Sequence, residues 1–452
     1  MRYTLTISDN VAALLTQTIF AIPGREGAAY LVCGVSRTEN ETRLLAREVI
    51  AVQDAHYLLR ELDRLSIRSE SYVPVAKRAR LNNETVLFVH SHPKGYPTFS
   101  PADNIEEPKL MRFLGSRAPA TPHGSMVCSE PGLFDARVWI DEGWETVERI
   151  RLLGRRFRFI DMVQGEDPLP EFFDRQVRAF GPDIQRLLLR LHVGVVGVGG
   201  TGSATVEQLT RLGVGCISVF DGDQLTASNV TRVYGSNMDD AGRGKTEIQV
   251  ERLRRIGFHT RLDGFPRHIT EETTVRHLRD CDVVFGCTDK HAPRGILVRL
   301  ALRYLIPVFD MAVKIDSQKQ TIRGIWGRVT TLMPGEACLF CRETITSGHI
   351  RAETLPAEQH EREADEEYAP ELATDEPAVI MFTTAVAAQA VSELLHRLTG
   401  FMGEQRVSSE VLLQLHEARI HTNRMRPKAD CLCQQQQHWG RGDSRNFLGL
   451  TW

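Results

Sequence analysis

VGVVGVGGTGSATVEQLTRLGV, residues 193–214, predicts a buried strand, a glycine turn and a helix that begins directly after the turn. The glycines form the pattern Gly-x-Gly-x-x-Gly, which lets the backbone approach phosphate groups at the positive end of a helix. The glycines that we expect to bind a nucleotide are Gly197, Gly199, Gly200 and Gly202. The next strand, ISVFDGD, ends at Asp221, which is placed as a ribose-binding acid would be. Up to this point, an NAD-dependent dehydrogenase fits equally well.

Strand-like and helix-like segments alternate along residues 171–435, on both sides of the glycine turn. Short apolar runs such as CISVFDGD, DVVFGCTD and IPVFDMAV are separated by segments with helical spacing. This alternation is typical of a parallel sheet with helices on both faces. The sequence therefore predicts an α/β fold of the Rossmann-like, doubly wound type for this region.

Polar residues downstream of Asp221 argue against hydride transfer. Hydride transfer does not require an arginine and a lysine near the phosphates of the nucleotide. An adenylating site does require such cations, because it must neutralise the triphosphate of ATP. A carboxylate at the end of a later strand can also hold Mg²⁺ against the phosphates. The residues concerned are Asn229, Arg232, Lys245 and Asp289.

This ordered set resembles the ThiF, MoeB and ubiquitin-activating-enzyme family of adenylyltransferases over residues 171–435. The resemblance implies that Asp221 and Asn229 bind the ribose end of ATP. It also implies that Arg232 and Lys245 stabilise charge in the transition state, and that Asp289 holds Mg²⁺.

The family resemblance extends upstream to FFDRQVRAFG, which resembles a short N-terminal helix of the family. It implies that Arg175 reaches the ATP phosphates across a dimer interface, so we expect a homodimer. One departure is Val233, where the family usually has a glutamine after the arginine.

A second candidate site lies in ETVLFVHSHPKGYPTFSPADN, residues 84–104. Side chains alternate along a strand, so His90 and His92 point the same way and can bind one Zn²⁺. Asp103 can supply a third ligand and leave a fourth position for water, as in catalytic zinc sites. Ser100 and Asp103 also suit the first turn of a helix, and the two interpretations are compatible.

HSHPKGYPTFSPAD resembles the JAMM/MPN⁺ motif of zinc isopeptidases that cleave ubiquitin-like proteins, and this resemblance covers roughly residues 1–150. It implies an N-terminal α/β/α domain in which His90, His92 and Asp103 bind the catalytic zinc. By the same resemblance Ser100 helps to stabilise the oxyanion and Glu26 is the general base. Alternatives to Glu26 that the sequence leaves open are Glu39, Glu41 and Glu48.

The cysteines fall into two groups. CLFC and CLC supply close pairs of soft ligands, which suit a closed, structural zinc site, and members of the adenylyltransferase family often carry one. The predicted ligands are Cys338, Cys341, Cys431 and Cys433. The others lie in or beside apolar strands, where free cysteine is mostly a buried hydrophobe; they are Cys33, Cys128, Cys216, Cys281 and Cys287.

No cysteine lies between Cys341 and Cys431, although full activating enzymes have a nucleophilic cysteine in the crossover loop that follows the adenylation site. The acyl-adenylate could pass to another protein's thiol, which is the explanation we favour, or a core cysteine could move in. Alternatively, a loop hydroxyl could accept the acyl group as an ester, with His349 or His360 nearby in sequence. The candidate hydroxyls are those of Thr344, Thr346 and Ser347.

Composition sets the class of protein and its compartment. Hydrophobic residues make up 42% of the 452 residues, charged residues 25%, and the net charge is −3, which does not suggest nucleic-acid binding. No apolar run reaches the length of a membrane span, so no membrane partner is expected. Paired cysteines of the metal-binding kind suit a reducing cytoplasm. The expected organisation is a JAMM-like domain (1–155), a linker (156–170), an adenylation domain (171–435) and a flexible tail (436–452), with an acidic surface loop at 350–376.

Together, the two resemblances predict an enzyme that adenylates the C-terminus of a ubiquitin-like protein, using ATP and Mg²⁺, and that also processes or detaches this protein with zinc. A conjugating enzyme is an expected further partner, because such fusions occur in bacterial ubiquitin-like conjugation operons, some of which are linked to phage defence. The alternatives are activation of a sulfur carrier in cofactor biosynthesis, and a scaffold in which both sites are inactive.

Overall fold

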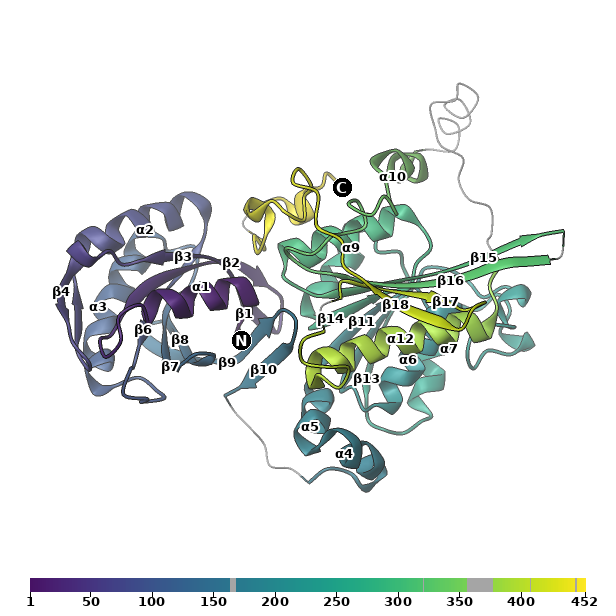
Figure 1. The fold of residues 1–452 in the computed structure, drawn as a ribbon, viewed down its shortest axis with the longest axis horizontal. Coiled ribbons are helices and arrows are strands. Elements are labelled where there is room, and N and C mark those ends of the chain that lie inside the picture. Colours follow the sequence, from purple (N-terminus) through teal and green to yellow (C-terminus); the bar gives the residue numbers. More distant parts are fainter. Residues whose placement is uncertain (163–167, 320, 356–376, 407, 444) are drawn as a thin grey trace. The chain divides into compact units, whose positions relative to one another are not determined.

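The computed structural model describes residues 1–162, 168–319, 321–355, 377–406, 408–443 and 445–452. The chain divides into two compact units (Figure 1). Unit 1 contains Met1–Glu166, Arg303–Leu305 and Gln436–Thr451, and unit 2 contains Asp167–Leu302, Ile306–Gln435 and Trp452. Within the described ranges, no helix is both long enough and apolar enough to cross a membrane.

A curved sheet forms the centre of unit 1. Its strands are β1 (Arg2–Ser8), β2 (Ala28–Arg37), β3 (Glu41–Ala51), β6 (Thr85–Ser91), β7 (His123–Glu130), β8 (Leu133–Ile140), β9 (Gly143–Leu153) and β10 (Phe157–Asp161). They follow the order β1-β3-β2-β6-β7-β8-β9-β10, and a further pairing of β1 with β9 closes the first seven into a ring. A separate two-stranded sheet consists of β4 (Tyr57–Arg60) and β5 (Leu65–Ile67).

Helices cover both faces of this sheet. The helices are α1 (Asp9–Ile19), α2 (Ser69–Asn82) and α3 (Pro101–Arg117). Alternate residues of β2 face opposite sides: Leu31 packs in one core with Leu15 of α1, while Tyr30 packs in another with Ala79 of α2 and Leu114 of α3. Burial on both faces explains why strands such as AAYLVCGV are almost continuously apolar.

Unit 2 has a mixed sheet. Its strands are β11 (His192–Val196), β12 (Cys216–Phe220), β13 (Arg261–Phe265), β14 (Val283–Gly286), β15 (Val308–Gln318), β16 (Thr321–Leu332), β17 (Glu410–Gln414) and β18 (Arg419–Asn423). The order is β13-β12-β11-β14-β15-β16-β17-β18; pairs from β13 to β15 are parallel and those from β15 to β18 antiparallel. The parallel part confirms the α/β fold predicted from the alternation of segments.

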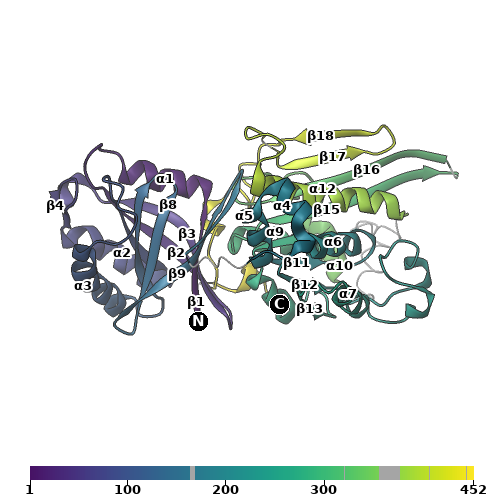
Figure 2. The ribbon, with the colours of Figure 1, turned by 90° about the horizontal axis from the view of Figure 1, so that it is seen from below.

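Helices flank the parallel strands of unit 2, with α9 on one side and α6 and α12 on the other (Figure 1). The α-helices are α4 (Asp174–Phe180), α5 (Pro182–Arg190), α6 (Gly200–Arg211), α7 (Lys245–Arg254), α8 (Glu272–Val275), α9 (His291–Arg303), α10 (Ser347–Thr354) and α12 (Ile380–Thr399). The long helix α12 packs on α6, β15 and β16 (Figure 2). Strand order reverses between β11 and β14, so the carboxyl ends of these strands border the position where such folds bind ligands.

Two predicted segments differ from the structure. The stretch expected to begin a linker at residue 156 instead contains β10, which pairs antiparallel with β9, buries Phe157 and packs Ile160 against the core of unit 1. The expected flexible tail packs on unit 1: Gly442 bridges Val35, and Phe447 is 5% exposed. Of the predicted acidic loop, residues 356–376 lie outside the described part.

Candidate functional site

The glycine turn of unit 2 lies between β11 and α6, as predicted. Gly197 has a φ of +84°, and a Cβ at this position would lie 3.0 Å from the carbonyl oxygen of Cys287. A Cβ on Gly202 would lie 1.8 Å from the carbonyl oxygen of Gly197. These contacts require glycine and leave the first N–H groups of α6 at the carboxyl edge of the sheet, an arrangement that favours anions.

Asp221 follows β12 and fixes the shape of this turn. Its Oδ2 accepts the N–H of Val198 at 2.8 Å, and its Oδ1 accepts the N–H of Asp223 at 2.9 Å. Burial raises the pKa of Asp221, and the charge of Lys245 opposes that shift. The carboxylate therefore supports the loop beside the site where a nucleotide is expected.

The predicted cations lie at the same edge. Lys245 begins α7, and its Nζ is 2.9 Å from Asp223 Oδ2. A Cβ built on Gly200 would lie 3.3 Å from Cδ of Arg232, so this side chain passes next to the first residue of α6. Arg232 donates to the carbonyl of Ser228 at 3.2 Å.

The remaining predicted nucleotide ligands are Asn229 and Asp289. Asn229 is half-buried in a short turn, where its Oδ1 accepts the N–H of Thr226 at 3.4 Å. Asp289 is exposed and follows β14, whose end packs against Gly197. Because β11, β12 and β14 are parallel neighbours, the glycine turn, Asp221 and Asp289 all lie at one edge.

Val233, the noted departure from the family pattern, is 3% exposed in a small core with Leu225 and Ile248. Its apolar side chain therefore serves packing rather than a polar contact.

Arg175 is not brought to this edge within its own chain. It is exposed on α4, beside Gln176, whose amide donates to the carbonyl of Arg211 at 2.7 Å. Arg211 ends α6, the helix that begins at Gly200. A helix rises about 1.5 Å per residue, so α4 is anchored at the opposite end of α6 from the glycine turn.

A second cluster forms in unit 1, where the structure brings together His90, His92 and Asp103. The Nε2 atoms of the two histidines are 3.0 Å apart. Asp103 Oδ1 is 3.4 Å from Nε2 of His90, and Asp103 Oδ2 is 3.5 Å from Nε2 of His92. Ligands at tetrahedral Zn²⁺ with nitrogen and oxygen bond lengths lie about 3.4 Å from each other, so these residues fit the ion.

The neighbours of the two histidines orient their rings. Nδ1 of His92 is 3.0 Å from the carbonyl oxygen of Tyr96, and Nδ1 of His90 is 3.5 Å from Oε1 of Glu107. Both Nε2 atoms therefore turn toward Asp103, as metal-binding histidines are oriented in other proteins. Glu107 is 5% exposed and accepts from Arg137 and Ser125, both at 2.6 Å.

Asp103 and Ser100 have a double role. The Ser100 hydroxyl accepts the N–H of Asp103 at 3.2 Å, and Asp103 Oδ2 accepts the N–H of Ser100 at 2.6 Å, which caps α3. Burial alone would raise the pKa of Asp103, but hydrogen bonds to His90 and His92 lower it well below its ordinary value. The carboxylate thus stays ionised, as a metal ligand must be.

Glu26 lies just before β2, next to the two histidines. Ala28 pairs with His90, and the N–H of Gly27 donates to the Ser91 hydroxyl at 2.9 Å, which places Glu26 at the histidine end of β6. Burial raises the pKa of Glu26 to about 7, although the charges of His90 and His92 lower it. Its carboxyl group therefore lies within electrostatic reach of both rings.

The other glutamates considered for the base are engaged elsewhere. Glu41 is buried with Arg43 and Arg151, at 2.8 Å and 2.9 Å. Glu48 pairs with Arg78 at 2.8 Å, and Glu39 is exposed in the turn before β3. Of these candidates, only Glu26 shares its surroundings with the histidines.

Glu107 was missed in the sequence, although it lies four residues after Asp103 on the same face of α3. Changing Glu107→Gln should weaken Zn²⁺ binding at the histidine cluster by about 10–100-fold, because the orienting carboxylate is lost. Competition with a chromogenic chelator measures this affinity. The matched control is Glu106→Gln, since Glu106 is exposed and, within the described ranges, forms an ion pair with Lys109 alone. Equal affinity in the two variants would contradict this role for Glu107.

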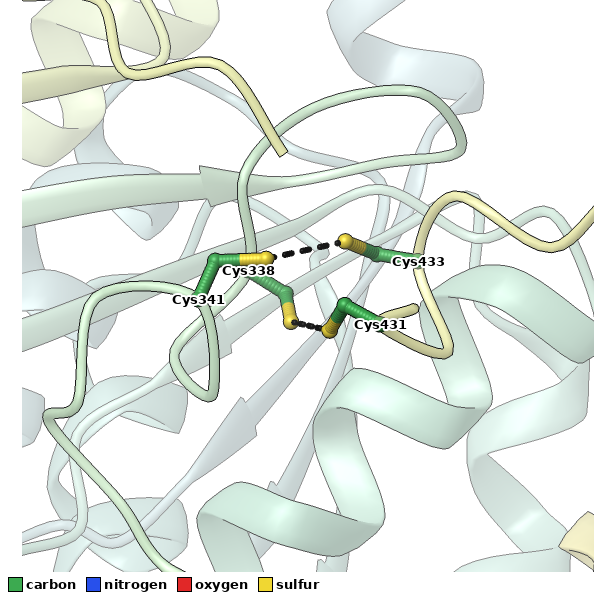
Figure 3. Close-up of side chains that lie close together, drawn as sticks. All are labelled: Cys338, Cys341, Cys431 and Cys433. Atoms are coloured by element: carbon green, nitrogen blue, oxygen red, sulfur yellow. Dashed lines mark hydrogen bonds between the residues drawn. The ribbon is translucent and has the colours of Figure 1, made fainter. Parts of the chain in front are cut away.

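Four cysteines meet in unit 2, as the sequence predicts (Figure 3). Sγ of Cys338 is 3.5 Å from Sγ of Cys431, and Sγ of Cys341 is 3.4 Å from Sγ of Cys433. A disulfide would need about 2.05 Å, whereas sulfurs around a tetrahedral Zn²⁺ lie about 3.8 Å apart. The four thiols therefore fit a closed zinc site that ties the segment after β16 to the segment after β18.

The pKa values of two of the clustered thiols, Cys338 and Cys431, shift in opposite directions. A hydrogen bond from Cys433 is the main reason that the pKa of Cys338 falls to about 6, and burial raises the pKa of Cys431 to about 12. One thiolate thus forms readily, and a metal ion would favour ionisation of the others.

Cys33, Cys128 and Cys281 are buried, as predicted, whereas Cys216 and Cys287 are only half-buried. Burial raises the pKa of Cys287 far above its ordinary value, which leaves the thiol next to the glycine turn protonated and weakly nucleophilic.

Comparisons with known proteins found curated relatives that match about a third of this chain. Curated relatives include a sulfur carrier protein adenylyltransferase of Thermus thermophilus, 30% identical over 35% of this chain and 59% of that protein. A tRNA threonylcarbamoyladenosine dehydratase of Escherichia coli is 28% identical over 30% of this chain and 51% of its own length. Ubiquitin-like modifier-activating enzyme 5 of Xenopus laevis is 29% identical over 37% and 43%, respectively. This chain thus spans about half the length of the curated relatives that it matches.

Among solved structures, Escherichia coli MccB with ATP is 17% identical, with a TM-score of 0.46 over 59% of this chain and 75% of that chain. The sequence profile of the ThiF family matches residues 173–435, which is more than half of the chain. The protein is therefore a member of the ThiF family.

Proposed function

We propose that unit 2 adenylates the C-terminal carboxylate of a ubiquitin-like or sulfur carrier protein with ATP. The observation that carries the proposal is the gathering of the glycine turn, Asp221, Arg232, Lys245 and Asp289 at one edge of a ThiF-family sheet. Two of the relatives are named for activating such proteins.

The proposed reaction is attack of the substrate carboxylate on the α-phosphorus of ATP, with pyrophosphate as the leaving group. The first N–H groups of α6 would bind phosphate oxygens. Arg232 and Lys245 would stabilise the charge that builds up on the phosphates in the transition state. Asp221 and Asn229 would hold the ribose end, and Asp289 would hold Mg²⁺, which neutralises phosphate charge.

Pyrophosphate exchange into ATP tests the proposal. Purified ubiquitin-like and sulfur carrier proteins with a free Gly-Gly C-terminus are offered one at a time, together with Mg²⁺ and labelled pyrophosphate. Exchange that depends on one of these proteins is expected and identifies the substrate class. Absence of exchange with every protein, or exchange that does not need a carboxylate partner, would contradict adenylation and favour the scaffold alternative.

For unit 1 we propose a zinc-dependent peptidase of the JAMM type, which processes or detaches the same partner protein. The observation that supports it is the convergence of His90, His92 and Asp103 with Glu26 beside them. Zn²⁺ at this cluster would supply an acidic bound water. Glu26 would accept the proton of that water and pass it to the leaving amine, and the Ser100 hydroxyl would donate to the oxyanion.

A homodimer with shared sites is part of the proposal, and the support is the position of Arg175 at the far end of its own α6. Co-expression of Arg175→Ala and Lys245→Ala chains with different tags tests it. Each single variant should be inactive in exchange. Random pairing should restore about a quarter of the sites, because mixed dimers contain one intact site.

If Arg175 acted within its own chain, the co-expressed mixture would be as inactive as the two variants alone. A mixture of the variants purified separately and not allowed to exchange subunits serves as the control. A conjugating enzyme as a further partner, and a bacterial cytoplasmic setting, remain parts of the proposal that the sequence resemblance supports.

A further inference from the structure

Thr346 and His349 form a hydroxyl–imidazole pair at the start of α10. The Thr346 Oγ1 lies 2.7 Å from Nδ1 of His349 and also accepts the backbone N–H of His349 at 3.2 Å. With the ring proton on Nε2, Nδ1 accepts the hydroxyl proton. A helix cap needs only the second of these hydrogen bonds, so the first is additional and matches the contact between a nucleophile and its general base.

A third group holds the imidazole of His349. Its ring stacks on the ring of His291, with centroids 4.5 Å apart and an interplanar angle of 13°. His291 in turn begins α9, where Glu353 of α10 accepts the N–H groups of His291 and Ala292 at 2.9 Å and 2.7 Å. Nδ1 of His291 is buried without a hydrogen-bond partner among the described residues. Contacts with α9 and within α10 therefore fix the position of the Thr346–His349 pair.

The position of the pair connects it to the nucleotide edge. His291 follows Asp289 by two residues, so their Cα atoms are at most about 7 Å apart. Helix α10 packs on α9, since a Cβ on Gly295 would lie 2.8 Å from Cδ1 of Ile350. The hydroxyl of Thr346 thus belongs to the same edge of the sheet as the residues proposed to bind ATP.

Among the described residues, the other two candidate hydroxyls, those of Thr344 and Ser347, have no imidazole partner. Thr344 accepts a hydrogen bond from the Arg328 guanidinium at 3.3 Å, and Ser347 is exposed on the first turn of α10. Since the segment from 342 to 430 contains no cysteine, Thr346 is the one nucleophile there that the described structure pairs with an imidazole.

We propose that Thr346 accepts the acyl group of the adenylated partner protein as an oxygen ester, with His349 as general base. The Oγ1 of Thr346 attacks the carbonyl carbon of the acyl-adenylate while its proton passes to Nδ1 of His349. The bond between this carbon and the phosphate oxygen breaks, and AMP leaves. The ester then serves an amine or thiol acceptor. This step rests on the adenylation proposed above and replaces the direct hand-over that we favoured from the sequence.

Two acyl sources test the proposal on the full chain. One is ATP with the partner protein that gives the strongest exchange, and the other is chemically prepared N-acetylglycylglycyl-adenylate. Intact mass spectrometry should find an adduct that resists thiols and is cleaved by mild alkali, and peptide mapping should place it on Thr346.

Variants separate chemistry from helix capping. Thr346→Ser keeps hydroxyl and cap and should retain the adduct, whereas Thr346→Asn keeps a good cap but should lose it. His349→Asn should slow its formation by about 100-fold or more. Ser347→Ala, next in sequence and exposed, should behave as the unchanged protein.

The two proposals can fail separately. Exchange without any adduct, or an adduct that survives in Thr346→Asn, would overturn the ester while leaving adenylation standing. Acylation of Thr346 by the prepared adenylate without exchange for any partner protein would support the pair and refute the adenylation proposal.

Discussion

Replacing Cys341 by serine should lower the melting temperature of the protein by about 8–16 °C and prevent binding of the Zn²⁺ ion expected at the four-cysteine cluster. Linkage at a free Zn²⁺ concentration 1,000 times the dissociation constant stabilises a fold by about 4.1 kcal/mol. For a domain of this size, each kcal/mol corresponds to about 2–4 °C. The effect is large because the four thiols join segments that are far apart in sequence.

Calorimetry together with metal analysis measures both quantities. The matched control is Cys287→Ser, because Cys287 is half-buried and belongs to none of the groups of possible metal ligands among the described residues. The control should keep its zinc and nearly all of its stability. Unchanged zinc content and melting temperature in Cys341→Ser would show that the cluster holds no structural metal.

Arg232→Ala should slow pyrophosphate exchange by about 10²–10³-fold, the loss typical for one donor to a charged transition state. Arg232 passes beside the first residue of α6, and within the described part of the chain its guanidinium donates to a backbone carbonyl and forms no ion pair. Its charge is therefore not offset by a carboxylate, in contrast to that of Lys245, which pairs with Asp223.

Separate measurement of kcat and of KM for ATP in Arg232→Ala tests whether Arg232 acts in binding or in catalysis. If Arg232 acts in the transition state, kcat should fall much more than KM for ATP rises. Arg255→Ala is the control, since Arg255 is 75% exposed at the end of α7, where it pairs with Glu251. An Arg232→Ala enzyme with the exchange rate of this control would remove Arg232 from the proposed site.

Local patterns were sufficient to predict the glycine turn, the histidine–aspartate cluster of unit 1 and the four-cysteine cluster of unit 2. Gly-x-Gly-x-x-Gly, His-x-His and the cysteine pairs have fixed spacings that follow from backbone geometry and ligand geometry. The alternation of segments likewise predicted the parallel sheet. These patterns could not predict the hydrogen bonds that each site residue forms with its neighbours in the fold. One example is the hydrogen bond that Asp221 accepts from the N–H of Val198.

Tertiary contacts explain the expectations that were wrong. The C-terminal residues look polar and flexible in sequence, yet Asp443 accepts the N–H of Arg37 at 2.8 Å, and Phe447 is buried, across about four hundred residues of chain. The strand β10 was hidden beside glycine, prolines and charges, because its partner β9 decides its structure. Likewise, the sequence offered three loop hydroxyls, and only folding pairs Thr346 with His349.

We propose that this chain contains two separate reaction centres, one that adenylates and one that hydrolyses. The most direct measurement follows both activities in Lys245→Ala and Glu26→Gln, with a C-terminally extended partner protein as the substrate for cleavage and its processed form for exchange. We predict that Lys245→Ala loses exchange and keeps cleavage, and that Glu26→Gln loses cleavage and keeps exchange. Loss of both activities in either variant, with the fold intact, or loss of neither, would contradict the claim.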